Sequence, residues 1–259
     1  MSIFTRSKPV TTAELATQTA PVRSVQLVKG IGAANDRVDI TKRGASPDLV
    51  KRFDKSGISL SKRGLDGIRA EAVMLLDHSL SMEYDYENGS VQAIVERALG
   101  FALQIDVDGT IPVIKFDNRA HKPVDVNLTN YQAVVRNSLY SRRNMGSTNL
   151  TAALAELKAI SRQSDSPIFA IVVTDGEPND TVSSEALVRE LEGYPVFLKF
   201  LSVRPVEFLD KLDDMSRALI DNADAKSITG TESDLEFADK MVDEWDTWIA
   251  AAQRVGVLR

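Results

Sequence analysis

Four short apolar runs, each followed by polar residues, constrain the fold of this chain more than any other feature. They cover residues 71–77, 111–116, 167–174 and 196–203. A continuous apolar run of this length is typical of a strand buried on both faces, as in a parallel sheet. Between the runs, apolar residues recur at helical spacing, for example over 91–103 and 150–160. The pattern predicts an α/β fold over residues 68–254, a doubly wound, mostly parallel sheet flanked by helices.

The first 67 residues lack this rhythm. Residues 1–23 are rich in Thr, Ala and Pro, which predicts a flexible tail. Residues 24–67 then show a strand-like alternation three times, at 25–30, 38–42 and 58–62. Three short strands bury little surface alone, so we expect a short β-rich arm that packs on the following domain or on a partner.

Charge divides the chain at the same place. Residues 1–67 carry 12 Lys+Arg against 6 Asp+Glu, and residues 68–259 carry 19 against 31. A basic arm on an acidic body indicates either charge balance within the molecule or a separate binding function. The basic residues are scattered and have no aromatic residues between them, so we do not expect nucleic-acid binding.

The residue inventory excludes several kinds of chemistry. The chain has no cysteine and only two histidines, His78 and His121, among 259 residues. Disulfides, Cys-ligated zinc, iron–sulfur clusters and thiol nucleophiles are therefore excluded, which leaves carboxylates and hydroxyls. The N-terminus lacks the apolar stretch of a signal peptide, and no apolar run approaches the roughly 18–20 residues of a membrane span. We expect a cytoplasmic protein with no membrane contact.

Polar side chains follow two of the apolar runs and precede one predicted helix. They are Asp77, Ser79, Ser81, Thr148 and Asp175. Any one of them alone would fit a helix cap or a turn, but ligands of such sheets bind beyond the C-terminal strand ends, where these five would meet. Two carboxylates and three hydroxyls offer only oxygen ligands, which suit Mg²⁺, Ca²⁺ or Mn²⁺. Because the hydroxyls are neutral, a coordination position can stay open for an acidic group from outside.

The same residues resemble a known site. The D-x-S-x-S motif at 77–81, the Gly-x-Thr segment at 146–148 and T-D-G at 174–176 resemble the metal-ion-dependent adhesion site (MIDAS) of von Willebrand factor A (VWA) domains. The resemblance extends over about residues 70–250. It implies that Ser79, Ser81 and Thr148 ligate a divalent cation, with Mg²⁺ as the first expectation, and that the two aspartates act mostly through water. A carboxylate from a protein partner would complete the coordination shell.

A narrower resemblance suggests a process. Residues 106–117 and the loop 82–89 are similar to the A domains of bacterial tellurium-resistance and chemical-stress proteins, and the arm resembles the start of the small tellurium-resistance domain. This implies a non-enzymatic scaffold that acts in the response to tellurite or chemical stress. Four residues beside the site are then assigned to partner contacts, namely His78, Asp85, Glu87 and Glu177. The partner and the oligomeric state stay open.

Two alternatives remain at this point. Asp106-Val-Asp108-Gly-Thr110 matches the D-x-D-G-T nucleophile motif of haloacid-dehalogenase-type phosphotransferases, which would make the chain a metal-dependent phosphohydrolase. That chemistry needs the first aspartate at the end of a buried strand, whereas here helical spacing precedes it and a strand follows. The other alternative is a VWA module in which the metal only stabilises the fold.

Overall fold

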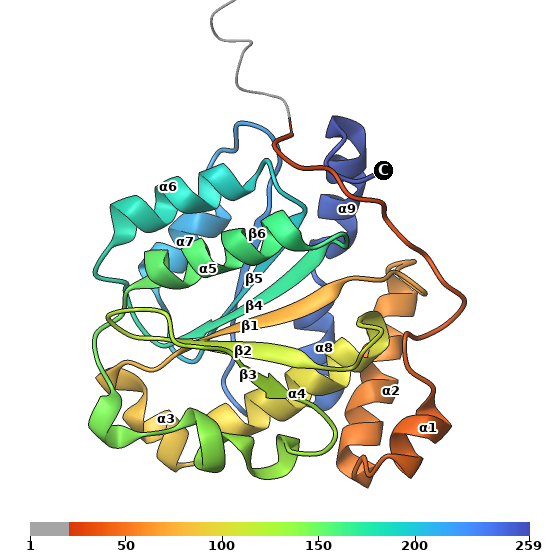
Figure 1. Cartoon of the computed structure of the whole chain (residues 1–259), viewed down its shortest axis with the longest axis horizontal. Helices are drawn as coiled ribbons and strands as arrows, with labels where there is room; N and C mark the ends of the chain where they lie inside the picture. Colours follow the sequence, from red (N-terminus) through yellow and green to blue (C-terminus); the bar gives the residue numbers. More distant parts are fainter. Residues whose placement is uncertain (1–20) are drawn as a thin grey trace, which may run out of the picture.

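Six strands form one sheet in the order β3-β2-β1-β4-β5-β6 (Figure 1). The computed structural model describes residues 21–259, so residues 1–20 of the predicted tail lie outside it. The strands are β1 (Glu71–Asp77), β2 (Ile111–Phe116), β3 (Val124–Val126), β4 (Ile168–Thr174), β5 (Val196–Ser202) and β6 (Ala223–Ser227). All neighbours are parallel except β3, which runs antiparallel to β2. The predicted α/β fold with a mostly parallel sheet is confirmed.

Helices cover both faces of the sheet (Figure 1). The longer ones after the first strand are α4 (Ser90–Ile105), α5 (Leu150–Gln163), α6 (Thr181–Leu191), α7 (Glu207–Asp213), α8 (Asp234–Val242) and α9 (Trp245–Val255). The alternation of side chains along β1 joins the two layers, since Val73 and Leu75 belong to the core under α5 and α6. Met74 and Leu76 belong to the opposite core, under α4 and α8.

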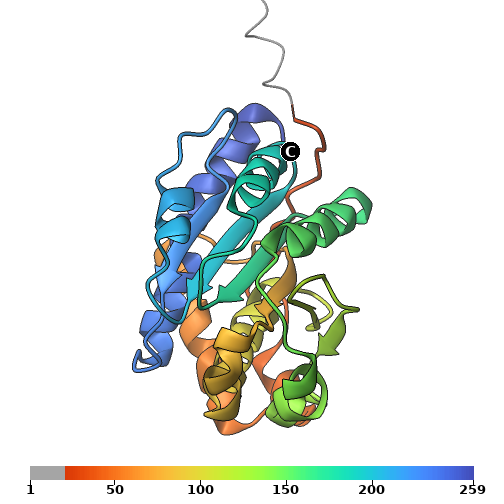
Figure 2. The same cartoon turned by 90° about the vertical axis from the view of Figure 1, so that its left-hand side faces the viewer.

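Short helical turns make up the connections. They are η2 (Leu80–Met82), α3 (Glu83–Glu87), η3 (Tyr131–Ala133), η4 (Val135–Leu139) and η5 (Arg142–Asn144). Figure 2 views the molecule from the side that carries α3. On the sheet, β1 has β2 on one side and β4 on the other, so the strand order reverses between β1 and β4. This reversal marks the place where ligands of doubly wound sheets bind.

The prediction of a β-rich arm is wrong for two of its three segments. Residues 38–42 lie in α1 (Arg37–Lys42), and residues 58–62 end α2 (Pro47–Lys62). Ser46 caps α2 by accepting a hydrogen bond from the backbone N–H of Leu49, with proline at the first helical position. The remaining segment, residues 25–30, is extended but forms only isolated bridges, such as that between Val25 and Leu258.

The alternation at 58–62 has a helical explanation. Ser59 and Leu60 are both buried, next to each other on the inner side of α2, while Ile58 is 44% exposed. The hydroxyl of Ser59 donates to Asp239 of α8, so a serine can occupy this buried position. The cue that sequence analysis missed is the Ser46-Pro47 start of the helix, followed by apolar residues at helical spacing.

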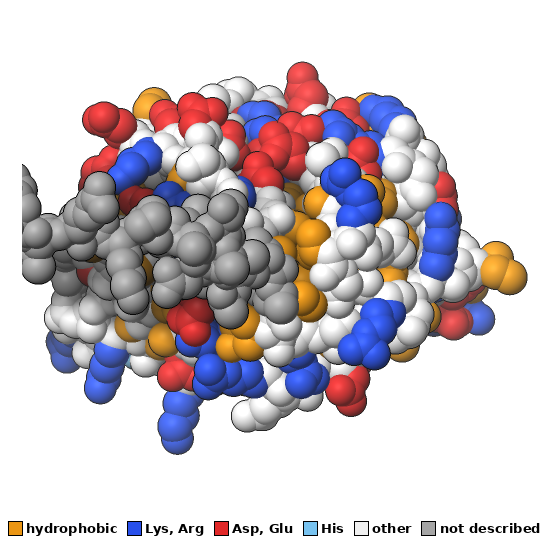
Figure 3. Space-filling view, turned by 90° about the horizontal axis from the view of Figure 1, so that it is seen from above, with side chains coloured by type: hydrophobic (Ala, Val, Ile, Leu, Met, Phe, Trp, Pro, Cys, Tyr) orange, Lys and Arg blue, Asp and Glu red, His pale blue; other side chains and the backbone are white. Residues whose placement is uncertain are grey.

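Ion pairs join the basic N-terminal segment to the acidic body. The pairs are Arg23–Asp165, Lys51–Asp234, Arg52–Glu96, Arg52–Asp234, Lys62–Asp239, Arg63–Asp243 and Arg63–Asp246. Figure 3 shows acidic and basic side chains interspersed over one face of the molecule. Partly exposed pairs contribute little stability each. Taken together, these pairs show that basic residues of the N-terminal segment balance acidic residues of the body within the same molecule.

The C-terminal helical region is broken rather than continuous. α8 starts with a capping box in which Ser233 and Glu236 exchange hydrogen bonds with each other's backbone. It ends at Val242, and Glu244 adopts a left-handed conformation with φ of 61° before α9. Among residues 21–259, no helix is long and apolar enough to cross a membrane.

We predict that Phe53→Ala lowers the free energy of unfolding by about 3 kcal/mol, because the ring is 4% exposed and its removal leaves a cavity under α2. The matched control is Ile58→Ala on the outer side of the same helix, for which we expect a loss of less than about 1 kcal/mol. Urea denaturation measures both. Equal losses in the two variants would show that α2 does not pack as described.

Candidate metal centre

The two central strands bring Asp77 and Thr174 together. β1 and β4 are parallel neighbours with Leu76 opposite Val173, so their last residues lie side by side. Thr174 Oγ1 donates a hydrogen bond to Asp77 Oδ2 at 2.6 Å, and the backbone N–H of Ser79 donates to Asp77 Oδ1 at 2.8 Å. Asp77 is completely buried. Its carboxylate is therefore fixed at the point where the strand order reverses.

The serines connect this carboxylate to the second one. Ser79 is the N-cap of η2, and its Oγ lies 3.0 Å from Ser81 Oγ. Ser81 Oγ then donates to Asp175 Oδ1 at 2.8 Å. Four of the five predicted metal-site residues thus form one hydrogen-bonded chain, which passes from Asp77 to Ser79 through a backbone N–H and then through the two serine hydroxyls to Asp175.

The loop with the fifth residue, Thr148, is held between the other two loops. Gly146 pairs with Ser79 in a parallel bridge, and its carbonyl accepts from Leu80 N at 3.0 Å. The carbonyl of Thr148 accepts from Asn179 N, just beyond Asp175, at 2.9 Å. The residue after it, Asn149, caps α5, so Thr148 is not the helix cap.

A side chain at position 146 would crowd this loop. A Cβ there would lie 3.1 Å from Asp117 Cβ and from Asn118 Oδ1. Glycine therefore lets the Thr148 loop approach the end of β2 closely.

Burial governs the electrostatics of the two aspartates. Burial raises the pKa of Asp77 to about 6, against the hydrogen bonds from Thr174 and Ser79, which lower it. Burial also raises the pKa of Asp175, although Ser81 and Arg204 favour its ionised form. Two buried carboxylates next to hydroxyls form a site whose negative charge a divalent cation would balance.

The residues assigned to partner contacts divide into two pairs. Glu87 and Glu177 are exposed, and they accept hydrogen bonds from the hydroxyl of Tyr140 and the backbone N–H of Phe208. His78 and Asp85 are buried, 0% and 7% exposed, so their assignment to a surface that a partner contacts is corrected.

His78 faces away from the serines. Its Nε2 lies 3.3 Å from the backbone N of Ser141, and its Nδ1 lies 3.7 Å from Asp117 Oδ2. Burial and the charge of Lys115 lower the pKa of His78 to about 4. It therefore packs neutral behind the site, where His121 also contacts Asp117 at 2.7 Å.

Asp106 lies at the other edge of the sheet. Its carboxylate accepts the backbone N–H of Ala72, at the start of β1, at 2.9 Å and that of Asp108 at 3.1 Å. Asp77 comes five positions after Ala72 along β1, which is roughly 16 Å. Asp106 ends helix α4 rather than a strand, so it connects a helix end to a strand start and lacks the placement of a phosphotransferase nucleophile.

Two charged groups, in β5 and just after it, were not predicted from the sequence. Arg204, just after β5, pairs with both Asp175 and Asp85. The sequence feature that could have revealed Arg204 is its position just after a parallel strand, at the same edge of the sheet as Asp77. The other group is Lys199 in β5, which is fully buried and pairs with Asp224 of β6.

A carboxylate cluster surrounds this buried pair. Asp213, Asp224 and Glu244 bring carboxylate oxygens within 4.8 Å of one another. Lys199 and Lys226 pair with the two oxygens of Asp224, and Lys199 also donates to the carbonyl of Asp243. Lysine side chains already contact both oxygens of Asp224, and the cluster connects β5 and β6 to the α8–α9 junction.

A family of known domains matches most of this chain. Residues 69–258 match the family described as vWA-TerF-like, the vWA domain found in the C terminus of TerF. The chain belongs to the von Willebrand factor A family.

Individual similarities are more distant. Uncharacterized protein YcbR of Bacillus subtilis (strain 168) is 27% identical over 225 residues, which is 83% of this chain and 91% of that protein. Manganese-loaded TRAP protein of Plasmodium vivax is 15% identical, with a TM-score of 0.47 over 69% of this chain and 73% of that one. Proximal thread matrix protein 1 of the mussel byssus, solved with a zinc-occupied MIDAS motif, is 16% identical, with a TM-score of 0.44 over 67% and 46%.

We predict that Asp77→Asn stabilises the protein in EDTA at pH 8. A raised pKa in the folded state favours folding below the ordinary value of 3.8, and this gain is lost as the pH rises through about 6. Asparagine removes the buried charge, so the free energy of unfolding should rise by about 2 kcal/mol at pH 8 and by less at pH 5. Urea denaturation at both pH values measures this difference, with Asp125→Asn, at an exposed position of β3, as the control. A loss of stability at pH 8 would contradict the prediction.

Proposed function

We propose that this chain is a non-enzymatic module that binds a divalent cation and uses it to dock an acidic side chain of a protein partner. The observation that supports the proposal is the hydrogen-bonded chain Asp77–Ser79–Ser81–Asp175 at the point where the strand order reverses. The side chains of these four residues offer only oxygen atoms as metal ligands, from two carboxylates and two hydroxyls. This set fits Mg²⁺ first and Mn²⁺ or Ca²⁺ next.

The partner follows from the charge balance. Ser79, Ser81 and Thr148 would hold the cation with neutral hydroxyls, and Asp77 and Asp175 would act mostly through water. Such an ion keeps affinity for an additional carboxylate, which supports an acidic residue as the docking group. Leu80 and Tyr84, next to the serines, are 59% and 69% exposed, so the partner would also cover apolar surface.

Family membership supports a role in the response to tellurite or chemical stress. The matching family is defined on the vWA domain of TerF, and the match covers residues 69–258. In this role the module would hold a partner in a complex through the metal site. The position of Asp106, at the opposite edge of the sheet from the site, favours this proposal over a phosphohydrolase.

We predict that the purified chain binds Mg²⁺ and Mn²⁺ and that Ser79→Ala weakens the binding roughly 10–100-fold, because a ligand atom and the support of Ser81 are lost together. Isothermal titration calorimetry measures the affinity. The matched control is Ser161→Ala, another buried serine, which lies on α5 and is completely inaccessible to solvent. We expect its affinity to equal that of the unsubstituted chain.

Two results would contradict the proposal. One is the absence of binding by the unsubstituted chain at millimolar metal. The other is phosphatase turnover that Asp106→Asn alone abolishes, which would support the phosphohydrolase. If Ser79→Ala instead unfolds in every buffer while the chain binds metal, the metal has a structural role.

We predict that a host strain lacking this chain grows more poorly on tellurite and that the unsubstituted chain restores growth. Ser79→Ala should fail to restore it, and Ser161→Ala should succeed. Growth at graded tellurite concentrations measures this, with protein levels checked by immunoblot. Full restoration of growth by Ser79→Ala would show that tellurite tolerance does not depend on the metal site.

A further inference from the structure

Arg204 holds the second carboxylate of the site. It lies in the loop after β5, and its two terminal nitrogens pair with Oδ2 of Asp175 and Oδ2 of Asp85. The side chain of Asp175 is 2% exposed, whereas that of Arg204 is 42% exposed. The guanidinium therefore reaches the buried site from solvent and connects it to α3.

The contact between Arg204 and Asp175 affects how strongly the site attracts a cation. Asp175 accepts Ser81 Oγ on one oxygen and Arg204 on the other, so both of its oxygens are engaged. A divalent cation beside Ser81 would lie close to a fixed positive charge in a partly buried environment, where repulsion is stronger than in water. The arginine therefore opposes binding of the cation alone.

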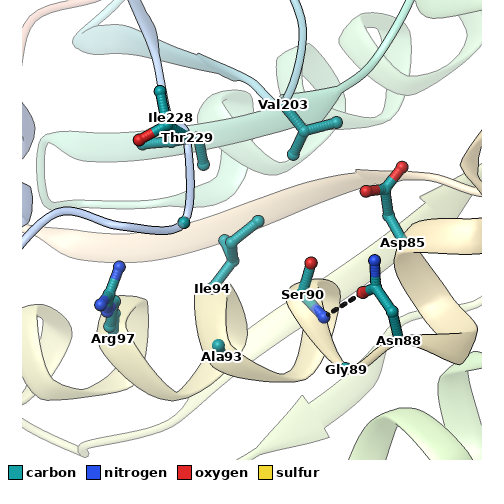
Figure 4. A pocket seen from close by; sticks show the side chains of 11 residues that line it. Asp85, Asn88, Gly89, Ser90, Ala93, Ile94, Arg97, Val203, Ile228 and Thr229 are labelled. Atoms are coloured by element: carbon teal, nitrogen blue, oxygen red, sulfur yellow. Dashed lines mark hydrogen bonds between the residues drawn. The ribbon is translucent and has the colours of Figure 1, made fainter.

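The side chain of Arg204 is partly exposed to solvent, whereas the backbone before it is held by the end of β4. The backbone N–H of Val203, the residue before it, donates to the carbonyl of Thr174 at 3.1 Å. Asp85 and Val203 also line a cavity of about 280 Å³ between α4 and the loops after β5 and β6 (Figure 4). Because the side chain of Arg204 is 42% exposed, its guanidinium can leave Asp175 toward solvent without any change in the strands.

We propose that Arg204 makes this site selective for a carboxylate ligand by binding the second oxygen of the partner's carboxylate, whose first oxygen meets the cation. The inference rests on the proposed function. A planar guanidinium matches a carboxylate with paired hydrogen bonds, and an incoming anion neutralises the repulsion between the arginine and the cation. Cation and carboxylate should therefore bind cooperatively, and a neutral oxygen ligand should lack this effect.

Calorimetric titration of Mn²⁺ into the full chain tests the inference, in buffer alone, with sodium acetate, and with acetamide at equal ionic strength. We expect acetate, but not acetamide, to tighten Mn²⁺ binding severalfold. Arg204→Ala should bind Mn²⁺ alone about tenfold more tightly, since the repulsion is gone, and should lose the acetate effect.

The matched control is Arg63→Ala. Arg63 also bridges two aspartates, Asp243 and Asp246, and its side chain is 35% exposed, but it lies on the N-terminal segment away from the site. We expect its Mn²⁺ affinity and its acetate effect to equal those of the unsubstituted chain. Equal changes in the two arginine variants would show a nonspecific effect of net charge and would overturn the inference.

Arg204→Lys keeps the charge but loses the paired geometry. We expect an Mn²⁺ affinity like that of the unsubstituted chain and a smaller acetate effect, and this variant also decides the question if Arg204→Ala does not fold. If the unsubstituted chain binds no Mn²⁺, the proposed function fails and the inference with it. If it binds Mn²⁺ but Arg204→Ala or Arg204→Lys leaves both quantities unchanged, only the inference fails.

Discussion

The hydrogen bond between Thr174 and Asp77 joins the fold to the site. It connects the last residues of two parallel strands whose pairing forms the centre of the sheet. The bond requires β1 and β4 to be neighbours and in register, because a shift of one residue would turn Asp77 toward the opposite face. From this position Asp77 accepts the backbone N–H of Ser79, whose hydroxyl leads through Ser81 to the carboxylate of Asp175.

Holding Asp77 there has an energetic cost. The residue is completely inaccessible to solvent, and burial alone moves its pKa toward neutrality. A structural role would not need the charge, since an asparagine could accept from Ser79 N–H and donate to the hydroxyl of Thr174. A buried charge that opposes folding is expected where function requires the charge, and cation binding is a function that does.

Sequence patterns predicted this part of the molecule well because it follows simple rules. Buried parallel strands read as apolar runs, and the residues after them must meet at one edge. The N-terminal segment did not follow such a rule. In α2, a buried serine beside a buried leucine imitates the alternation of a strand, and only the bond from Ser59 to Asp239, 180 residues later, makes the helix face complete.

The charged partners could not be predicted for a related reason. Lys199 stands in an apolar strand, and its acceptance there depends on Asp224 from the next strand and on a carbonyl at the α8–α9 junction. Arg204 likewise depends on Asp85, which comes from a helix more than a hundred residues earlier. The periodicity of a sequence predicts which face of a helix or strand a residue occupies, but it does not predict which residue distant in the sequence will contact it.

Comparison of two arginines shows what distinguishes a functional contact from a structural one. Arg63 and Arg204 each bridge two aspartates and are similarly exposed. The aspartates of Arg63 are 31% and 36% exposed, so water can solvate them if the arginine leaves. Asp175 is 2% exposed, and without Arg204 its remaining side-chain partner is the hydroxyl of Ser81. Release of Arg204 would therefore leave a buried carboxylate without its positive partner, and a divalent ion held by the adjacent serine hydroxyls would replace that charge.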